Sequence, residues 1–221
     1  MTRLAWEAHS LCVGSTRTYE TDLHESLDYA LREAGAYFMK EGRLRNTLRR
    51  LVSRLDDEGI AYALMGSLAL GEHGYMRMTE DIDMLLTPAG LARFHERLAG
   101  RGYVATHPGA TRGFRDAESG VRIEILVTGE FPGDGKPKPV SFPDPAVAAT
   151  EVDGVHVLTL PKVIELKLAS GMTAPHRLRD LADVQETIKA RGLDEQFAFQ
   201  LDPSVRPTYL DLLRAVRAAG S

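Results

Sequence analysis

The sequence predicts an α+β fold: a small mixed sheet with flanking helices, preceded by N-terminal helices and followed by a helical C-terminal part. Two observations lead to this prediction. The hydrophobic period is helical near both ends of the chain, whereas short apolar runs bounded by turn residues occupy the middle. We therefore divide the 221 residues into an N-terminal helical extension (1–59), a core (60–158) and a C-terminal helical part that packs on the core (159–221).

Two amphipathic patterns fill the N-terminal extension. An apolar stripe at helical spacing predicts a helix over residues 20–40. In the next helix leucines recur at positions 44, 48, 51 and 55, and the other faces carry the arginines Arg43, Arg45, Arg49, Arg50 and Arg54. An arginine-rich face of this kind is either solvated or binds RNA.

From Ile60 onward the pattern changes to strands. Strands are predicted at 60–65, 82–86, 102–106, 113–117 and 121–127, with helices at 67–74 and from Pro88 to about residue 100. Residues 129–145 contain five prolines and three glycines, which predicts a long loop that is either mobile or functional, for example as a border of an acceptor pocket. A strand at 154–160 then leads to helices at 161–172, 177–191 and 207–219.

The composition narrows the class of protein. With 43% hydrophobic and 26% charged residues the chain is typical of a globular protein, and its net charge of −4 argues against a surface that coats nucleic acid. The single cysteine, Cys12, leaves no internal disulfide, and neither a signal peptide nor a membrane span is evident. We therefore expect a cytoplasmic protein with no membrane partner. Seven histidines without metal-ligand spacing argue against a zinc site.

Asp81 and Asp83 flank Ile82 in an apolar strand. Side chains two positions apart on a strand point to the same face, so the two carboxylates project together while Ile82 packs into the core. Parallel carboxylates repel each other unless a positive charge lies between them, and a divalent cation usually supplies it. Taken alone, the pattern also fits a strand end with two solvated acids.

Two further features bear on this site. Gly66 and Ser67 follow the first strand at a predicted helix start, where glycine lets a phosphate approach the backbone and free N–H groups are available. A plain strand-to-helix turn is the alternative. Glu124 lies between two isoleucines in mid-strand, a costly position unless the carboxylate is paired or binds a metal. A cross-strand Glu–Arg pair is the alternative there.

Together these residues resemble the polymerase-β-like nucleotidyltransferase superfamily. Its pattern is an apolar residue with Gly-Gly or Gly-Ser, then Asp-apolar-Asp, then a third acid on a later strand. Here Met65 precedes Gly66 and Ser67, and the acids are Asp81, Asp83 and Glu124.

A second set of motifs resembles one branch of this superfamily. The segment 77–83, R-x-T-x-D-I-D, is similar to the minimal bacterial branch that includes AbiEii-type toxins. Residues 164–168 and 179–184 look like that branch's E-L-x-x-K-L and (R/K)-D-L-x-D-L helices, although Glu165 precedes Lys167 by only two positions. The resemblance covers about residues 60–190.

The resemblance implies a metal-dependent transfer of a nucleoside monophosphate from an NTP to a hydroxyl, with release of pyrophosphate. It implies Mg²⁺ or Mn²⁺ bound by Asp81, Asp83 and Glu124, with Glu124 also helping to deprotonate the hydroxyl. Gly66 and Ser67 would bind phosphates, Lys167 and Arg77 would neutralise phosphate charge, and Asp180 would fix Lys167. From the residues alone, Lys167 lies on an apolar helical stripe and could instead snorkel to water.

Three classes of function stay open. The first is transfer to a hydroxyl of RNA, such as tRNA, or of a protein, including action as a toxin of a toxin–antitoxin or abortive-infection system with a cognate antitoxin protein as partner. The second is a small-molecule nucleotidyltransferase of the aminoglycoside type. The third is a catalytically inactive nucleotide-binding protein of the same fold, which the complete set of acids disfavours.

Overall fold

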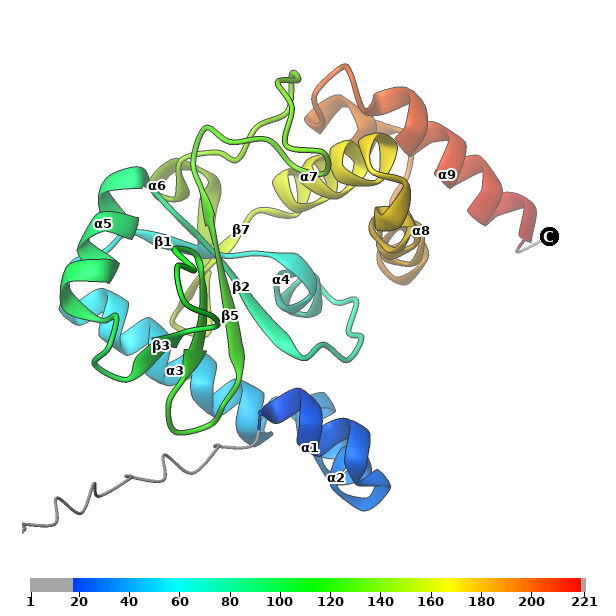
Figure 1. The fold of residues 1–221 in the computed structure, drawn as a ribbon. Helices are drawn as coiled ribbons and strands as arrows, with labels where there is room; N and C mark the ends of the chain where they lie inside the picture. Colours follow the sequence, from blue (N-terminus) through cyan, green and yellow to red (C-terminus); the bar gives the residue numbers. More distant parts are fainter. Residues whose placement is uncertain (1–17, 220–221) are drawn as a thin grey trace, which may run out of the picture.

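The computed structural model describes residues 18–219. Within them a seven-stranded mixed sheet has the strand order β3-β4-β5-β2-β1-β7-β6 (Figure 1). The strands are β1 (Tyr62–Leu64), β2 (Asp81–Leu86), β3 (Tyr103–Ala105), β4 (Gly113–Asp116), β5 (Arg122–Val127), β6 (Ala149–Val152) and β7 (Val155–Leu158). Strand β2 is parallel to β5 and antiparallel to β1. The predicted α+β class is confirmed.

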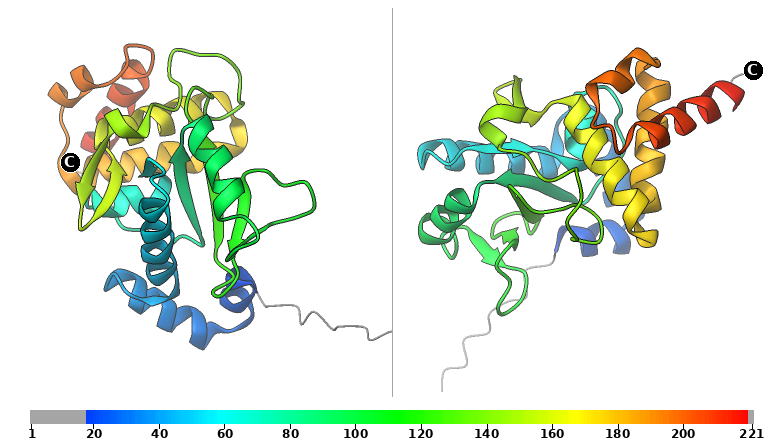
Figure 2. Two further views of the ribbon diagram at one scale, coloured as in Figure 1. Left: turned by 90° about the vertical axis from the view of Figure 1, so that its left-hand side faces the viewer. Right: turned by 90° about the horizontal axis from the view of Figure 1, so that it is seen from above.

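Helices flank this sheet. They are α1 (Tyr19–Glu25), α2 (Leu27–Phe38), α3 (Gly42–Asp57), α4 (Gly66–Glu72), α5 (Pro88–Arg97), α6 (Pro145–Ala148), α7 (Leu160–Thr173), α8 (Leu178–Arg191) and α9 (Arg206–Ala219), with 3₁₀ turns η1 (Pro175–Arg177) and η2 (Gln196–Gln200). Helices α3 and α5 lie on one side of the sheet and α4, α7 and α8 on the other (Figures 1 and 2). No helix in residues 18–219 is long and apolar enough to cross a membrane.

The alternation along β2 decides which side carries polar groups. Ile82 and Met84 are almost completely buried, whereas Asp81 and Asp83 are only partly buried. Because successive side chains on a strand point to opposite faces, the two aspartates share one face of β2. One hydrophobic cluster runs from Tyr19 to Leu213 and includes residues of all three predicted segments. The first 17 residues of the N-terminal extension, with Cys12, lie outside the described residues.

The helix predicted over residues 20–40 is wrong as a single element. Ser26 has extended backbone angles (φ −133°, ψ 108°), and its hydroxyl accepts a hydrogen bond from the Tyr29 N–H at the start of α2. Serine favours such capping positions over helix interiors because its side chain bonds to nearby backbone groups. The apolar stripe is therefore interrupted: Leu23 is buried, but Leu27 and Leu31 are 74% and 63% exposed.

Strand β6 was absent from the sequence prediction. It pairs with β7 across a two-residue turn in which Asp153 and Gly154 both have positive φ (51° and 77°). Asp-Gly is a preferred pair for such a hairpin turn, so the dipeptide itself carried a signal for the missed strand.

Helix α3 uses its arginines largely to hold neighbouring elements. Arg43 donates to Asp22, Arg45 to Glu72 and Arg50 to Asp116, at 2.7, 2.5 and 3.0 Å. The leucines of its other face are fully buried. Much of the positive charge that suggested an RNA-binding face is thus already matched by carboxylates.

Helices α7 and α8 meet at a glycine. A Cβ on Gly171 would lie 2.5 Å from Cγ of Leu181 on α8 and 3.3 Å from the Leu181 backbone nitrogen. A methyl group cannot fit at such distances without movement of the neighbouring helix. The absence of a side chain at Gly171 therefore lets α7 and α8 approach closely.

We expect Gly171→Ala to lower the free energy of unfolding by about 1–3 kcal/mol, because overpacking forces side chains or backbone to shift. Gly35→Ala is the matched control, since nothing lies within 4 Å of a Cβ at that position of α2. That control should raise stability by about 0.5–1 kcal/mol through helix propensity. Urea denaturation measures both, and equal effects would contradict the close contact.

Candidate active site

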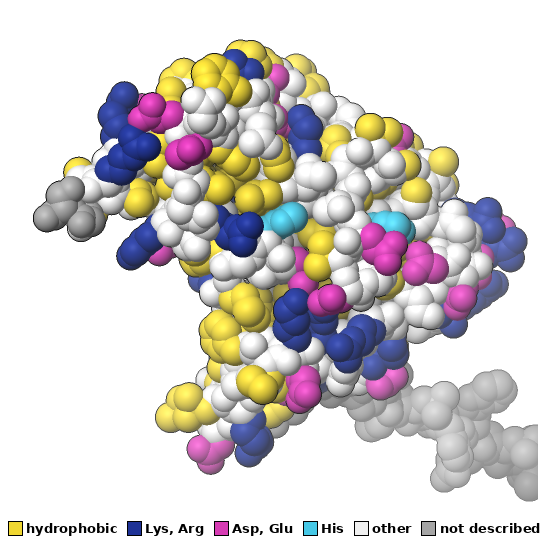
Figure 3. All heavy atoms as spheres, turned by 180° about the vertical axis from the view of Figure 1, so that it is seen from behind, with side chains coloured by type: hydrophobic (Ala, Val, Ile, Leu, Met, Phe, Trp, Pro, Cys, Tyr) yellow, Lys and Arg dark blue, Asp and Glu magenta, His cyan; other side chains and the backbone are white. Residues whose placement is uncertain are grey.

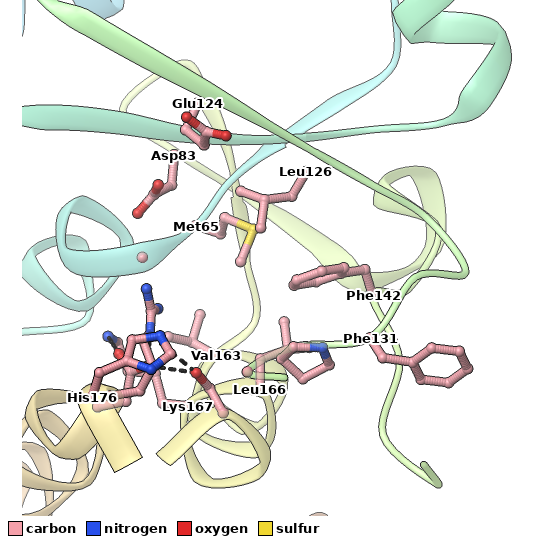
Figure 4. Close-up of a pocket in the computed structure, with 16 residues that line it drawn as sticks. Met65, Asp83, Glu124, Leu126, Phe131, Phe142, Val163, Leu166, Lys167 and His176 are labelled. Carbon is pink, nitrogen blue, oxygen red and sulfur yellow. Dashed lines mark hydrogen bonds and ion pairs between the residues drawn. The ribbon is translucent and has the colours of Figure 1, made fainter. Parts of the chain in front are cut away.

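A cavity of about 340 Å³ opens between the sheet, α7, η1 and loop 129–145. Small-molecule sites usually have volumes of roughly 300–1,000 Å³. Asp83 and Glu124 lie on one side of it and face Lys167 and His176, while aromatic side chains occupy the far end (Figure 4). Of the residues predicted from sequence, the cavity is lined by Gly66, Asp83, Glu124, Lys167 and Asp180.

The register of two parallel strands brings the acids together. In the β2–β5 pair, Asp83 lies opposite Glu124 and Asp81 lies opposite Arg122. Paired residues in a sheet share a face, so Asp81, Asp83 and Glu124 all point to the side that faces α4 and α7. Residues far apart in the sequence are thus placed on one surface by a single strand pairing.

Two of these acids have local partners. Asp81 accepts a hydrogen bond of 2.7 Å from the Thr79 hydroxyl, and Glu124 accepts one of 2.8 Å from Arg122. The Glu–Arg pair considered from sequence therefore exists, but within strand β5 rather than across strands. No donor in residues 18–219 hydrogen-bonds the Asp83 carboxylate.

Asp83 lies against the backbone at the start of α4. Gly66 has φ +66°, and a Cβ there would be 2.0 Å from Oδ2 of Asp83. Only glycine adopts this conformation without strain and leaves space for the carboxylate. Ser67, by contrast, is buried and does not line the cavity.

Burial, followed by the negative charge of the neighbouring Asp81, raises the pKa of Asp83 from 3.8 to about 7, although Lys167 and Arg177 act in the opposite direction. A carboxylate that has neither donors nor enough opposite charge is costly to ionise. Carboxylate oxygens are also the ligands that Mg²⁺ prefers, and Gly66 leaves room beside them, so this donor set fits a divalent cation.

The acids do not form a closed metal-binding cluster. Across residues 18–219 no three histidine, cysteine, aspartate or glutamate side chains are arranged to hold a metal ion. Asp81 and Glu124 instead accept hydrogen bonds from Thr79 and Arg122.

Lys167 is a buried cation held by two acids of α8. Its Nζ donates to Oδ1 of Asp180 at 2.9 Å and to Oδ2 of Asp183 at 2.7 Å. Asp180 also accepts bonds from the Ser170 hydroxyl and from Nε of Arg177. Lys167 is only 8% exposed and does not snorkel to bulk water.

Arg77 belongs to the same network rather than to the cavity. Its guanidinium donates two hydrogen bonds to the Asp183 carboxylate, at 2.6 and 2.9 Å. Together with Asp81 and Arg179 it lines a neighbouring hollow that also touches α1 and α2. Of the predicted residues, Arg77, Asp81 and Ser67 thus lie outside the main cavity, whereas Gly66, Asp83, Glu124, Lys167 and Asp180 line it.

Several lining residues were not singled out from sequence. His176 and Arg177 come from η1, the short connection between α7 and α8, and place an imidazole and a guanidinium opposite Asp83. Phe131 and Phe142 come from loop 129–145. The unusual composition of that loop was a signal for it, whereas two basic residues in a short helix connection carry no pattern that distinguishes them.

We expect Lys167→Met to lower the free energy of unfolding by about 3 kcal/mol, because Asp180 and Asp183 would keep buried negative charge with one cation fewer. Lys189→Met, an exposed position on α8, is the control and should stay within about 0.5 kcal/mol. Chemical denaturation without nucleotide measures both. An unchanged Lys167→Met variant would show that the ammonium is solvated.

A second prediction concerns pH. The pKa of Asp83 is raised from 3.8 to about 7 in the folded chain. Between these two pH values the folded chain keeps a proton on Asp83 that the unfolded chain has lost. The contribution of Asp83 to stability therefore falls as the pH rises from about 4 to about 7. Asp83→Asn should remove this fall and be more stable than wild type by about 1–3 kcal/mol at pH 8 in EDTA. If the free energies of unfolding of wild type and Asp83→Asn changed in parallel between pH 5 and pH 8, the raised pKa of Asp83 would be contradicted.

Comparison with known proteins gives one family match and several distant structural likenesses. ANT(2")-Ia in complex with adenylyl-2"-tobramycin is 10% identical with a TM-score of 0.47, and the alignment covers 80% of this chain and 98% of that one. An antigenic nucleotidyltransferase-like protein from Paracoccidioides brasiliensis is 18% identical with a TM-score of 0.45, over 65% and 74%. JHP933 from Helicobacter pylori is 17% identical with a TM-score of 0.43, over 87% and 92%. No curated protein matches the chain.

The match to a family model covers most of the chain. The model of the family described as "Uncharacterised nucleotidyltransferase" matches residues 13–199. The resemblance to the polymerase-β-like superfamily is thereby confirmed, whereas the AbiEii-type branch stays a prediction. By this match the chain belongs to that nucleotidyltransferase family.

Proposed function

We propose that the protein transfers a nucleoside monophosphate from an NTP to a hydroxyl of an RNA or protein acceptor, in a reaction that depends on Mg²⁺ or Mn²⁺. The observation that carries the proposal is the side-by-side placement of Asp83 and Glu124 in a cavity whose opposite wall is cationic. Such a cavity suits a triphosphate that carries a divalent cation, because negative and positive groups of the ligand each meet opposite charge.

Each residue has a defined task in this proposal. Asp81, Asp83 and Glu124 would hold the metal, which when bound stabilises charge on the attacking and leaving oxygens. Glu124 would also accept the proton of the attacking hydroxyl, and it lies within the cavity to do so. The hydroxyl oxygen forms a bond to the α-phosphorus, and the bond from that phosphorus to the oxygen bridging the α- and β-phosphates breaks, which releases pyrophosphate.

The phosphates would lie toward α7 and η1. Lys167 already has two carboxylate partners, so its position is fixed before a nucleotide arrives. Arg177 is half exposed beside Asp180 and can turn toward phosphate, and His176 lines the same wall. Gly66 and Ser67 would approach the phosphates through the backbone. Arg77, gripping Asp183, would act by positioning Lys167 rather than by direct contact.

The physiological role extends the proposal. A toxin function with a cognate antitoxin partner, in the cytoplasm, is supported by the resemblance of the segment 77–83 to AbiEii-type proteins. Aminoglycosides are the alternative acceptor class, and an inactive nucleotide-binding protein is the alternative without turnover.

The test is transfer of label from α-³²P NTPs to tRNA, to a protein pool or to aminoglycosides, with Mg²⁺ and with EDTA. We expect label on RNA or protein, with pyrophosphate release, only when the metal is present. Label on an aminoglycoside alone would replace the proposed acceptor. No label on any acceptor, together with metal-independent NTP binding, would favour the inactive alternative.

Glu124→Gln is the decisive variant in that assay. It should keep the fold and NTP binding but lose roughly a hundredfold or more in turnover, because the amide neither accepts the proton nor binds the metal as well. Glu118→Gln is the control, an exposed glutamate that also pairs with an arginine. Unchanged turnover in Glu124→Gln would show that Glu124 serves only as the ion-pair partner of Arg122.

A further inference from the structure

The cavity has two chemically different ends. Charged groups gather at one end, where Asp83 and Glu124 face Lys167 and His176 (Figure 4). Leu126 and Phe142 lie toward the other end with Leu166 of α7 below them, and the ring of Phe131 lies at the outer edge of that end, directed away from the charged groups (Figure 4). On the reverse side of the molecule, Figure 3 shows a surface on which basic and acidic side chains are interspersed, without a division of this kind.

An NTP has the same division. Its phosphates and their cation carry all the charge, whereas its base is uncharged and planar, with π faces that stack and edges that carry hydrogen-bonding groups. The α-phosphate has to lie at the acids for transfer to occur, so the phosphates belong at the charged end. A base at that end would take water from charged groups without replacing their hydrogen bonds, which is costly. At the apolar end no charged side chain loses water when a base enters.

We infer that the apolar end is a nucleobase subsite in which Phe131 and Phe142 hold the base by stacking and contact area, without reading its edge. This inference rests on the proposed function. The side chains at this end, those of Met65, Leu126, Phe131, Phe142, Val163 and Leu166, have no N–H or O–H donor and no oxygen acceptor. Stacking tolerates every base, whereas strong discrimination needs polar groups that a wrong base leaves unpaired.

The loop that carries the two rings is held in place without ligand. Gly129 donates its backbone N–H to the Phe142 carbonyl and Phe142 donates to the Glu130 carbonyl, both at 2.8 Å, which ties the ends of the loop together. Lys138 fastens the loop to α7, because its Nζ donates to the Pro132 carbonyl at 2.6 Å and to the Thr173 hydroxyl at 2.9 Å. A subsite that is already ordered loses little entropy when the base enters.

The experiment is calorimetry on the full chain with Mg²⁺ and five probes: ATP, GTP, CTP, UTP and tripolyphosphate. We expect the four NTPs to bind the wild type with dissociation constants within about tenfold of one another. Phe131→Ala and Phe142→Leu should each weaken all four by about tenfold, the loss expected for one stacking contact. Both variants should bind tripolyphosphate as the wild type does.

Phe199→Ala is the matched control, because this phenylalanine is 70% exposed and lies outside the cavity. Phe131 is only partly buried, so Phe131→Ala keeps the test open if Phe142→Leu fails to fold. Wild-type NTP affinity in the folded ring variants would overturn the subsite and leave the proposed function standing. A preference above a hundredfold for one base would overturn the absence of edge recognition. A wild type that binds no NTP would overturn the proposed function and the subsite with it.

Discussion

The arrangement of the cavity depends on one buried cation. Lys167 on α7 bonds to Asp180 and Asp183, which lie three positions apart on one face of α8. Asp183 in turn is gripped by Arg77 from the segment before β2, and Asp180 by Arg177 from η1. Removal of water from these charges is expensive, and the network is stable only because each carboxylate has several donors. It therefore joins α7, α8, η1 and the approach to β2 in one fixed geometry.

The aspartates around the cavity show how placement sets their chemistry. Burial disfavours the charged forms of Asp180 and Asp183, but the donors around them outweigh it and lower the pKa of both. Asp83 is also desolvated, but no donor in the described part of the chain hydrogen-bonds its carboxylate, and its pKa rises to about 7. A carboxylate that lines a cavity without enough neighbouring positive charge is stabilised most by a bound cation. The structural acids and the candidate functional acid are thus separated by their partners rather than by residue type.

The short motifs have physical explanations in this fold. In the segment 77–83, Arg77 anchors Asp183, Thr79 holds Asp81, and the next alternate position, Asp83, points into the cavity. Gly66 lacks the side chain that would strike Asp83. On α7, Lys167 faces inward while Gly171, one turn later, lets α8 come close enough to supply its acids. The spacing of the motifs therefore reflects one assembled site, in which the motif residues either hydrogen-bond one another or leave space for one another.

The sequence by itself determined the α+β class, most helices and strands, and the shared face of Asp81 and Asp83, because these follow from local periodicity. Tertiary structure alone decided that Glu124 lies beside Asp83, that Arg77 serves Asp183 instead of lining the cavity, and that Phe131 and Phe142 close its apolar end. These relations join residues from separate strands, helices and loops, and no local period encodes them. The break at Ser26 shows the same limit within one apolar stripe, since the stripe reports spacing but not the capping bond of Ser26 that starts a new helix.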